Sequence, residues 1–413
     1  MATAVTEPID GRARRNTSPR GEAAAKVAAP SHVRERWRMG TEARALVLVV
    51  GILISFGLAV LYSASAIVAL QEGKGSMFYM LRQLTGVAVG AVVFAVFAKL
   101  DAQRFEKWAW PIMAGSLTLM LVCVLPFTER IAPRIHGSRR FLFGASLQPS
   151  EMAKLAVIVW VAMLVVKKGP QLRRLTKGLL PFLVVVGALA LLAALEPDLS
   201  IAMMFFLVMG IILFAGGVRV GHFVALGIMG IPLLWHEAER LQYVVLRMAA
   251  FLDPGSAPTQ VNYQLKQSLL AVGSGGFFGK GFGEGMQQYG FLPFPYSDFI
   301  ASNIGEEWGF VGIVLLVAAF AVYGWLGFRI AERARSPFLR LVAVGLTATT
   351  VITAYLHIGV VIGLLPTTGL TLPFISYGRS NLVLTLLMTG ILVNIGSVKE
   401  RVIGEKAATS AGA

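Results

Sequence analysis

One carboxylate stands out as a candidate catalytic group: Asp298, within the stretch from Gly273 to Gly312. This stretch is the longest interruption of an otherwise apolar chain, and apolar sequence resumes directly after it. The acid is therefore predicted to lie close to a membrane surface, where an ionisable side chain is costly and marks a functional site. We expect this loop to present Asp298 to a lipid-linked substrate.

A group of cations on the predicted outer side is the second candidate for chemistry. Arg139 and Arg140 belong to a basic loop that also carries Arg130, Arg134 and His136. Membrane topology disfavours positive charge on that side. Two explanations are open: an external anion such as a lipid diphosphate, or attraction to anionic lipid headgroups.

Two short motifs place acids near the same side. QPSEMAK opens a predicted helix in which Glu151 and Lys154 lie three residues apart, a spacing that permits an ion pair. The spacing favours a structural pair, and a Lys154 free to meet substrate is the alternative. In EPDLS, Glu196 and Asp198 are typical of a solvated turn, which we favour over a functional site.

Other apparent motifs have structural explanations. GSGGFFGKG resembles a P-loop, but Ser274 replaces its first glycine and Gly281 replaces the residue after Lys280. We reject a nucleotide site and expect these glycines to let the backbone turn tightly against the helices; Lys280 is kept as a candidate substrate-binding cation. His357 and the other histidines lack metal-ligand spacing and are expected to be packed or hydrogen-bonded.

The elements that must position these side chains are membrane helices. Mean hydropathy is +0.71 and only 14% of residues are charged, against about 25% in a soluble domain. We predict an all-α polytopic membrane protein with about ten spans. They cover residues 45–69, 79–99, 108–127, 150–167, 178–195, 199–216, 219–236, 303–328, 338–364 and 374–396.

The positive charges predict the orientation of these spans. The net charge is +15, and most Lys and Arg flank alternate spans on the side of the N-terminus, so both termini are predicted to be cytoplasmic and nucleic acid is not an expected partner. A large extracytoplasmic loop, about 237–302, then separates the seventh and eighth spans. Residues 1–44 and 399–413 are predicted cytoplasmic tails, the first disordered, around a membrane domain of 45–398.

The run from His357 to Asn381 is predicted to face Asp298. Pro366 and Pro373 bracket an outer turn, after which Ser376 and Tyr377 are predicted to begin the last span. Broken, glycine-rich backbone at membrane depth is tolerated only against protein or a wet cavity. The run is therefore predicted to form the wall of a cavity.

Five motifs occur together and in order: QPSEMAK, EPDLS, YQLKQSLLAVGSGGFFGKG, LPFPYSDFI followed by IGEEWGFVG, and GLLPTTGLTLPFISYG. The chain resembles, over about residues 45–400, the SEDS family (shape, elongation, division and sporulation) of bacterial wall-synthesis membrane proteins. GMQQYGFLP with IGEE is more similar to the division branch, FtsW, than to the elongation branch, RodA.

The resemblance implies a SEDS-type fold and a peptidoglycan glycosyltransferase that polymerises lipid II on the outer face of the bacterial inner (cytoplasmic) membrane, at the division septum. Asp298 aligns with the essential acid of the family and would be the general base. The candidate substrate-binding residues are Arg139, Arg140, Glu151, Lys154, Lys280, Ser297, Ser376 and Arg379.

The same resemblance implies partners. These are lipid II and the nascent glycan strand, a single-pass class B penicillin-binding protein (an FtsI-like transpeptidase), other division proteins and membrane lipids. No cofactor is certain and the metal is unknown. A divalent cation, Mg²⁺ or Mn²⁺, could share the stabilisation of the leaving diphosphate, although no ligand cluster identifies one.

Departures from the family pattern leave alternatives open. Phe294 to Ser297 replace the usual Glu-Ala-His-Thr before the acid, Arg379 and Asn381 replace Gly and Ser, and His357 replaces Asn. Arg379 is thereby a candidate for a new anion contact. A lipid II flippase and a non-catalytic scaffold of the division complex are the competing functions.

Overall fold

The computed structural model describes residues 33–125, 128–129, 132–133, 139–142, 147–173, 178–223, 247–249, 251–252 and 259–403. The chain forms two compact units, one of Met1–Arg36 with Lys399–Ala413 and one of Trp37–Val398. β1 (Val33–Met39) and β2 (Ser397–Ile403) pair in a two-stranded sheet. Both strands include residues predicted as tails.

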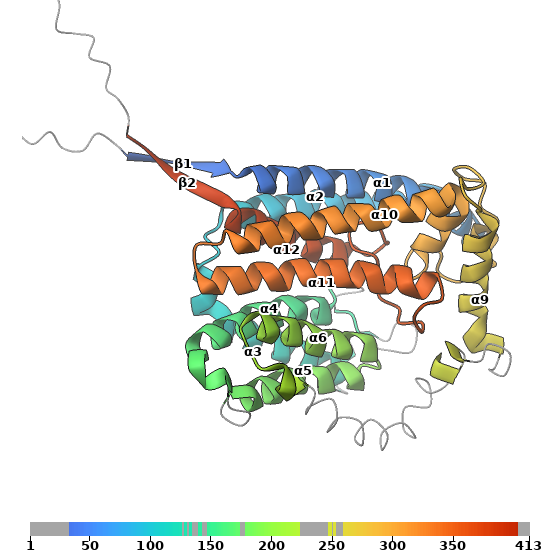
Figure 1. Cartoon of the computed structure of the whole chain (residues 1–413). Coiled ribbons are helices and arrows are strands. Elements are labelled where there is room, and N and C mark those ends of the chain that lie inside the picture. The colour runs from blue at the N-terminus through green and yellow to red at the C-terminus, as the bar shows by residue number, and fades with distance from the viewer. Residues whose placement is uncertain are drawn as a thin grey trace, which may run out of the picture. The chain divides into compact units, whose positions relative to one another are not determined.

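The second unit is helical throughout its described core (Figure 1). Its helices are α1 (Thr41–Gln71), α2 (Phe78–Lys99), α3 (Arg104–Val124), α4 (Pro149–Lys168), α5 (Leu180–Leu195), α6 (Leu199–Ala215), α9 (Thr259–Ser274), α10 (Ile300–Glu332), α11 (Pro337–Val361) and α12 (Arg379–Ile395). Short 3₁₀ turns cover Gly169–Arg173 and Gln287–Tyr289.

The hydropathy of these helices makes the chain a multi-pass membrane protein. Among the described residues, six helices are long and apolar enough to cross a membrane, and α5, α6 and α12 are shorter apolar helices. Nine predicted spans coincide with one of these helices. The predicted span 219–236 lies mostly outside the described residues, so the total of ten stays a prediction.

Polar side chains join the helix termini at one end of this unit. Asn394 in α12 donates to Ala98 O (2.8 Å) and accepts from Ala102 N (3.1 Å), which fixes α12 against the end of α2. Arg333, just after α10, pairs with Glu42 in the first turn of α1. This end carries the cations from which a cytoplasmic side was predicted. Asp298 precedes α10 and therefore lies at the opposite end.

α10 is broken at Gly309, where φ is 65° and ψ is −158°. A residue outside the helical region interrupts the i→i−4 ladder, and backbone groups at membrane depth need other partners. The glycine-rich segment 275–281 supplies them. Four backbone bonds join the two segments: Lys280 N to Glu306 O (3.0 Å), Gly281 N to Glu307 O (3.1 Å), Phe310 N to Gly276 O (2.9 Å) and Val311 N to Phe277 O (3.2 Å).

The close approach of these two segments requires a residue without a side chain at position 279. A Cβ at Gly279 would lie 2.1 Å from Glu307 O, far inside van der Waals contact. This confirms the expectation that the glycines let the backbone turn tightly against the helices. Gly283 has a similar left-handed φ, 80° against 82° at Gly279, but open space around its Cβ position.

The pair Gly279→Ala and Gly283→Ala separates close approach from backbone strain. Both variants place an L-residue at positive φ, which costs about 1–2 kcal/mol. Gly279→Ala additionally forces a methyl group into Glu307 O, so we expect a clearly larger fall in thermal unfolding midpoint, measured in detergent. Equal midpoints for the two variants would contradict the interlocked packing.

Candidate functional site

Asp298 lines a small pocket that is built from five segments of the chain. The acid comes from the loop before α10, Gln264 from α9, His357 from α11, and Arg247 from the residues before α9. The turn 367–370 completes the lining. The prediction that the run after His357 forms a cavity wall facing Asp298 is confirmed.

The loop that carries Asp298 is held through its backbone carbonyls. Ser376 Oγ donates to Ser297 O (2.6 Å), and Tyr377 N donates to Tyr296 O (2.9 Å). The Tyr296 ring also stacks on Tyr79, with centroids 4.6 Å apart. Ser376 and Ser297 thus lie beside the acid, and their binding of substrate stays a prediction.

The sequence predicted that Ser376 and Tyr377 begin the last helix, and this prediction is wrong. α12 begins at Arg379. The hydroxyl of Ser376 also accepts from Leu372 N (2.9 Å), so the residues before α12 form a hydrogen-bonded turn. Their polar groups bond to the Asp298 loop and to this turn instead of extending the helix.

Burial and nearby cations shift the pKa of Asp298 in opposite directions. Removal from water raises the pKa of Asp298 to about 6, although a hydrogen bond from the Ser297 side chain and the charges of Arg247 and Arg140 act to lower it. Arg247 is itself oriented by donating from Nη1 to Thr367 O (2.8 Å). A carboxylate with such a pKa is ionised at neutral pH yet remains basic enough to accept a proton.

Arg140 is held on the Glu196–Asp198 turn. Its guanidinium donates to Glu196 O (3.3 Å) and Pro197 O (3.0 Å), and it lies 3.5 Å from Asp198 Oδ2. Asp198 also accepts from Ile201 N (3.3 Å) at the start of α6. These contacts hold the arginine near enough to Asp298 for its charge to lower the pKa of that acid.

The prediction that this turn is solvated is wrong. Glu196 is only 3% exposed, and neither carboxyl oxygen has a hydrogen-bond partner within the described part of the chain. Burial, with a smaller effect of Asp198, raises the pKa of Glu196 to about 8. Glu196 is therefore buried although Pro197 beside it is exposed, and Asp198 is the acid of the turn that pairs with Arg140.

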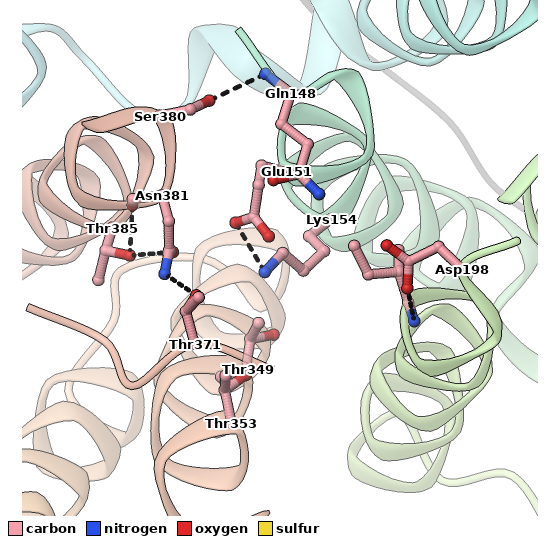
Figure 2. Close-up of polar contacts among 11 residues, drawn as sticks. Gln148, Glu151, Lys154, Asp198, Thr349, Thr353, Thr371, Ser380, Asn381 and Thr385 are labelled. Atoms are coloured by element: carbon pink, nitrogen blue, oxygen red, sulfur yellow. Dashed lines mark hydrogen bonds and ion pairs between the residues drawn. The ribbon is translucent and has the colours of Figure 1, made fainter. Parts of the chain in front are cut away.

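Glu151 and Lys154 form a buried ion pair on α4. Lys154 Nζ lies 2.8 Å from Glu151 Oε2, and the two side chains are 5% and 7% exposed. Figure 2 shows them pointing toward one another, with Asn381 and Thr371 on one side and Asp198 on the other. The structural pairing is confirmed, and a contact of Lys154 with substrate stays a prediction.

Of the predicted site residues, Asp298 alone lines this pocket, and three of the others make their contacts elsewhere. Arg139 pairs with Glu129 and donates to Leu125 O (3.1 Å). Lys280 lies 2.7 Å from the buried Glu306. The Arg379 side chain lies against α2, where a Cβ at Gly86 would be 3.2 Å from its Cγ. Arg130, Arg134 and His136 lie outside the described residues.

Arg247 and Gln264 are the pocket residues that sequence reasoning missed. A signal existed for Arg247, because it is a cation in the loop 237–302, on the side that topology disfavours. Gln264 carries no such signal. Among the described residues, no group of three or more His, Cys, Asp or Glu side chains is placed to hold a metal ion, and the divalent cation stays a prediction.

Comparison with known proteins gives consistent matches. A family model described as Cell cycle protein, covering FtsW, RodA and SpoVE, matches residues 43–401. A probable peptidoglycan glycosyltransferase FtsW of Trichlorobacter lovleyi is 37% identical over 367 residues, 88% of this chain and 96% of that protein. Stage V sporulation protein E of Bacillus subtilis is 35% identical over 352 residues, 85% of this chain and 95% of that protein.

Two solved structures share the fold. One, described as structural coordination of polymerization and crosslinking by a peptidoglycan synthase complex, has a TM-score of 0.72 at 24% identity and covers 86% of this chain and 97% of that chain. The crystal structure of RodA of Thermus thermophilus has a TM-score of 0.62 at 24% identity, with coverage of 85% and 95%.

The Glu151–Lys154 pair generates a stability prediction. Lys154→Met leaves a charged Glu151 buried without its partner and is expected to destabilise the protein by about 3–5 kcal/mol. The double variant Glu151→Met/Lys154→Met removes both charges and is expected to recover most of this loss, measured as the thermal midpoint in detergent. A double variant no more stable than the single one would contradict the buried pairing.

Proposed function

This chain belongs to the FtsW, RodA and SpoVE family, and from that premise we propose that it is a peptidoglycan glycosyltransferase that polymerises lipid II during cell division. The names of its relatives support the activity. One observation carries the assignment of the site: Asp298 lies in a pocket with Arg247, under the electrostatic influence of both Arg247 and Arg140.

The proposed reaction forms one bond and breaks one. The 4-hydroxyl oxygen of a lipid-linked disaccharide attacks C1 of the growing glycan, and the bond from C1 to undecaprenyl diphosphate breaks. Asp298 takes the hydroxyl proton as the oxygen attacks, which makes a weak nucleophile effective. A diphosphate leaves without protonation, so a second acid of the kind that glycosidases use is unnecessary.

The arginines around Asp298 have a separate task in this scheme. Negative charge collects on the diphosphate as the C1–O bond breaks, and preorganised cations stabilise the transition state more than the ground state. Arg247 and Arg140 are fixed by backbone carbonyls, at Thr367 and at the Glu196–Pro197 turn. They require little rearrangement to act.

We further propose the setting of this activity. A single-pass class B penicillin-binding protein is the partner, which is supported by the fold shared with a peptidoglycan synthase complex. The chain lies in the bacterial cytoplasmic membrane with both termini inside and the pocket outside. Lipid II supplied only from the outer face therefore yields glycan, whereas a flippase would leave it unpolymerised.

Asp298→Asn is expected to reduce glycan formation by at least a hundredfold, because the amide accepts no proton at neutral pH. The assay uses purified protein with its cognate transpeptidase and lipid II, and gel analysis of glycan. Asp101→Asn, at an exposed acid between α2 and α3, is the matched control and should remain active. Polymerisation by Asp298→Asn at the wild-type rate would remove the base from the mechanism.

The pH dependence follows from the direction of the pKa shift. Burial raises the pKa of Asp298 to about 6, so the reactive carboxylate is lost as pH falls through that value. We expect kcat/KM to be level at pH 7–8 and to fall about tenfold per unit below pH 6. Arg247→Gln removes a charge that favours the carboxylate and should move this acid limb to higher pH. A wild-type profile level down to pH 5 would count against the assignment.

A further inference from the structure

His357 carries an unused hydrogen-bond acceptor beside Asp298. The residue lies in α11 and is 1% exposed, with Nδ1 2.7 Å from Leu370 O. A carbonyl oxygen only accepts, so Nδ1 carries a proton. Because burial disfavours a charged ring, the ring is neutral and Nε2 keeps its lone pair. Nε2 is buried and has no hydrogen-bond partner within the described part of the protein.

A buried acceptor without a partner is unfavourable unless a ligand or water satisfies it. The His357 ring lines the same pocket as Asp298, and the carbonyl that binds Nδ1 belongs to Leu370, another residue of the pocket wall. The turn therefore fixes the ring in one orientation. Nε2 is then the ring atom whose hydrogen-bonding capacity is unused within the described part of the protein, and a donor that enters beside the ring would satisfy it.

The chemistry of the lining indicates which occupant fits. A lone pair on Nε2 repels the oxygens of a diphosphate and attracts an O–H or N–H donor. Asp298 is a second acceptor in the pocket, and the side-chain amide of Gln264 is a donor. Two acceptors with a neighbouring donor match a sugar face that carries adjacent hydroxyl groups.

We propose that His357 Nε2 accepts a hydrogen bond from a hydroxyl or amide N–H of the acceptor sugar, next to the hydroxyl that Asp298 deprotonates. The inference rests on the proposed glycosyltransferase function and assigns His357 to binding and orientation of the acceptor. His357 takes no proton in this scheme. Its bond is made in the ground state and kept in the transition state, so it lowers KM more than it raises kcat.

Two substitutions isolate the Nε2 atom. In His357→Asn the side-chain amide can occupy the place of Nδ1 and donate to Leu370 O, but nothing reaches the Nε2 position. In His357→Gln the longer side chain places its amide oxygen near Nε2 and restores an acceptor. Asn is the residue usual at this position in the resembling family, so His357→Asn is expected to fold.

The experiment measures initial rates of glycan formation at varied lipid II, with the cognate transpeptidase present. We expect His357→Asn to raise KM about fivefold, the effect of one lost hydrogen bond, with kcat within about twofold of wild type. His357→Gln should return KM to within about twofold. A thermal midpoint in detergent accompanies each variant, because a merely structural role would lower stability without this split between KM and kcat.

The outcomes separate the two proposals. If wild type forms glycan but KM is unchanged in His357→Asn, or is raised equally in both variants, the role of Nε2 is overturned and the polymerase function stands. If wild type forms no glycan while it binds lipid II in a filter assay, the polymerase function is overturned. In that case a loss of lipid II binding in His357→Asn that His357→Gln restores still supports the Nε2 contact.

Discussion

The architecture depends on one constraint: a backbone that leaves helical geometry within a membrane protein must find hydrogen bonds elsewhere. The break at Gly309 meets it by interlocking α10 with the glycine-rich segment 275–281. The side chain of Glu306 strengthens the same junction by accepting from Lys280 Nζ (2.7 Å), Met286 N (2.9 Å) and Gln287 N (3.2 Å). Asp298 lies two residues before the start of α10. Because the junction holds the first part of α10 in place, it also positions the loop that carries the acid.

The pocket combines charges that would be unfavourable separately. Burial disfavours the ionised form of Asp298, and Arg247 and Arg140 offset part of that cost. Arg140 in turn is held by Asp198, on whose pKa the paired Glu151 and Lys154 act in opposite directions, the first raising it and the second lowering it. The acids and bases therefore form a connected set from α4 to the Asp298 loop. The arginine charges favour the ionised form of Asp298, and burial keeps its pKa high enough for the carboxylate to accept a proton.

Hydropathy and local motifs predicted most of the framework. The starts of α2, α4 and α6 differ from the predicted spans by no more than one residue, because long apolar runs between polar turns have few alternative structures in a membrane. Glu151 and Lys154 were predicted to pair from their spacing alone. The β1 strand was missed, because a highly charged segment of alternating sequence was interpreted as a tail.

The composition of the pocket could not be predicted in the same way. Arg247 and Gln264 lie on segments whose proximity to Asp298 is a property of tertiary packing, and no local spacing encodes it. The burial of Glu196 has the same origin, since an acidic turn is usually exposed until another segment covers it. Residues that belong to a recognisable motif could be predicted, whereas residues that only the tertiary fold brings to the pocket could not.

The way the Asp298 loop is held has a consequence for its evolution. The carbonyls of Pro295, Tyr296 and Ser297 accept from Asn303, Tyr377 and Ser376, and a carbonyl is present whatever side chain the residue bears. Anchoring through the main chain frees these positions to diverge while the acid keeps its place. Changes at residues 294–297 can thus alter the surroundings of Asp298 without moving the acid itself.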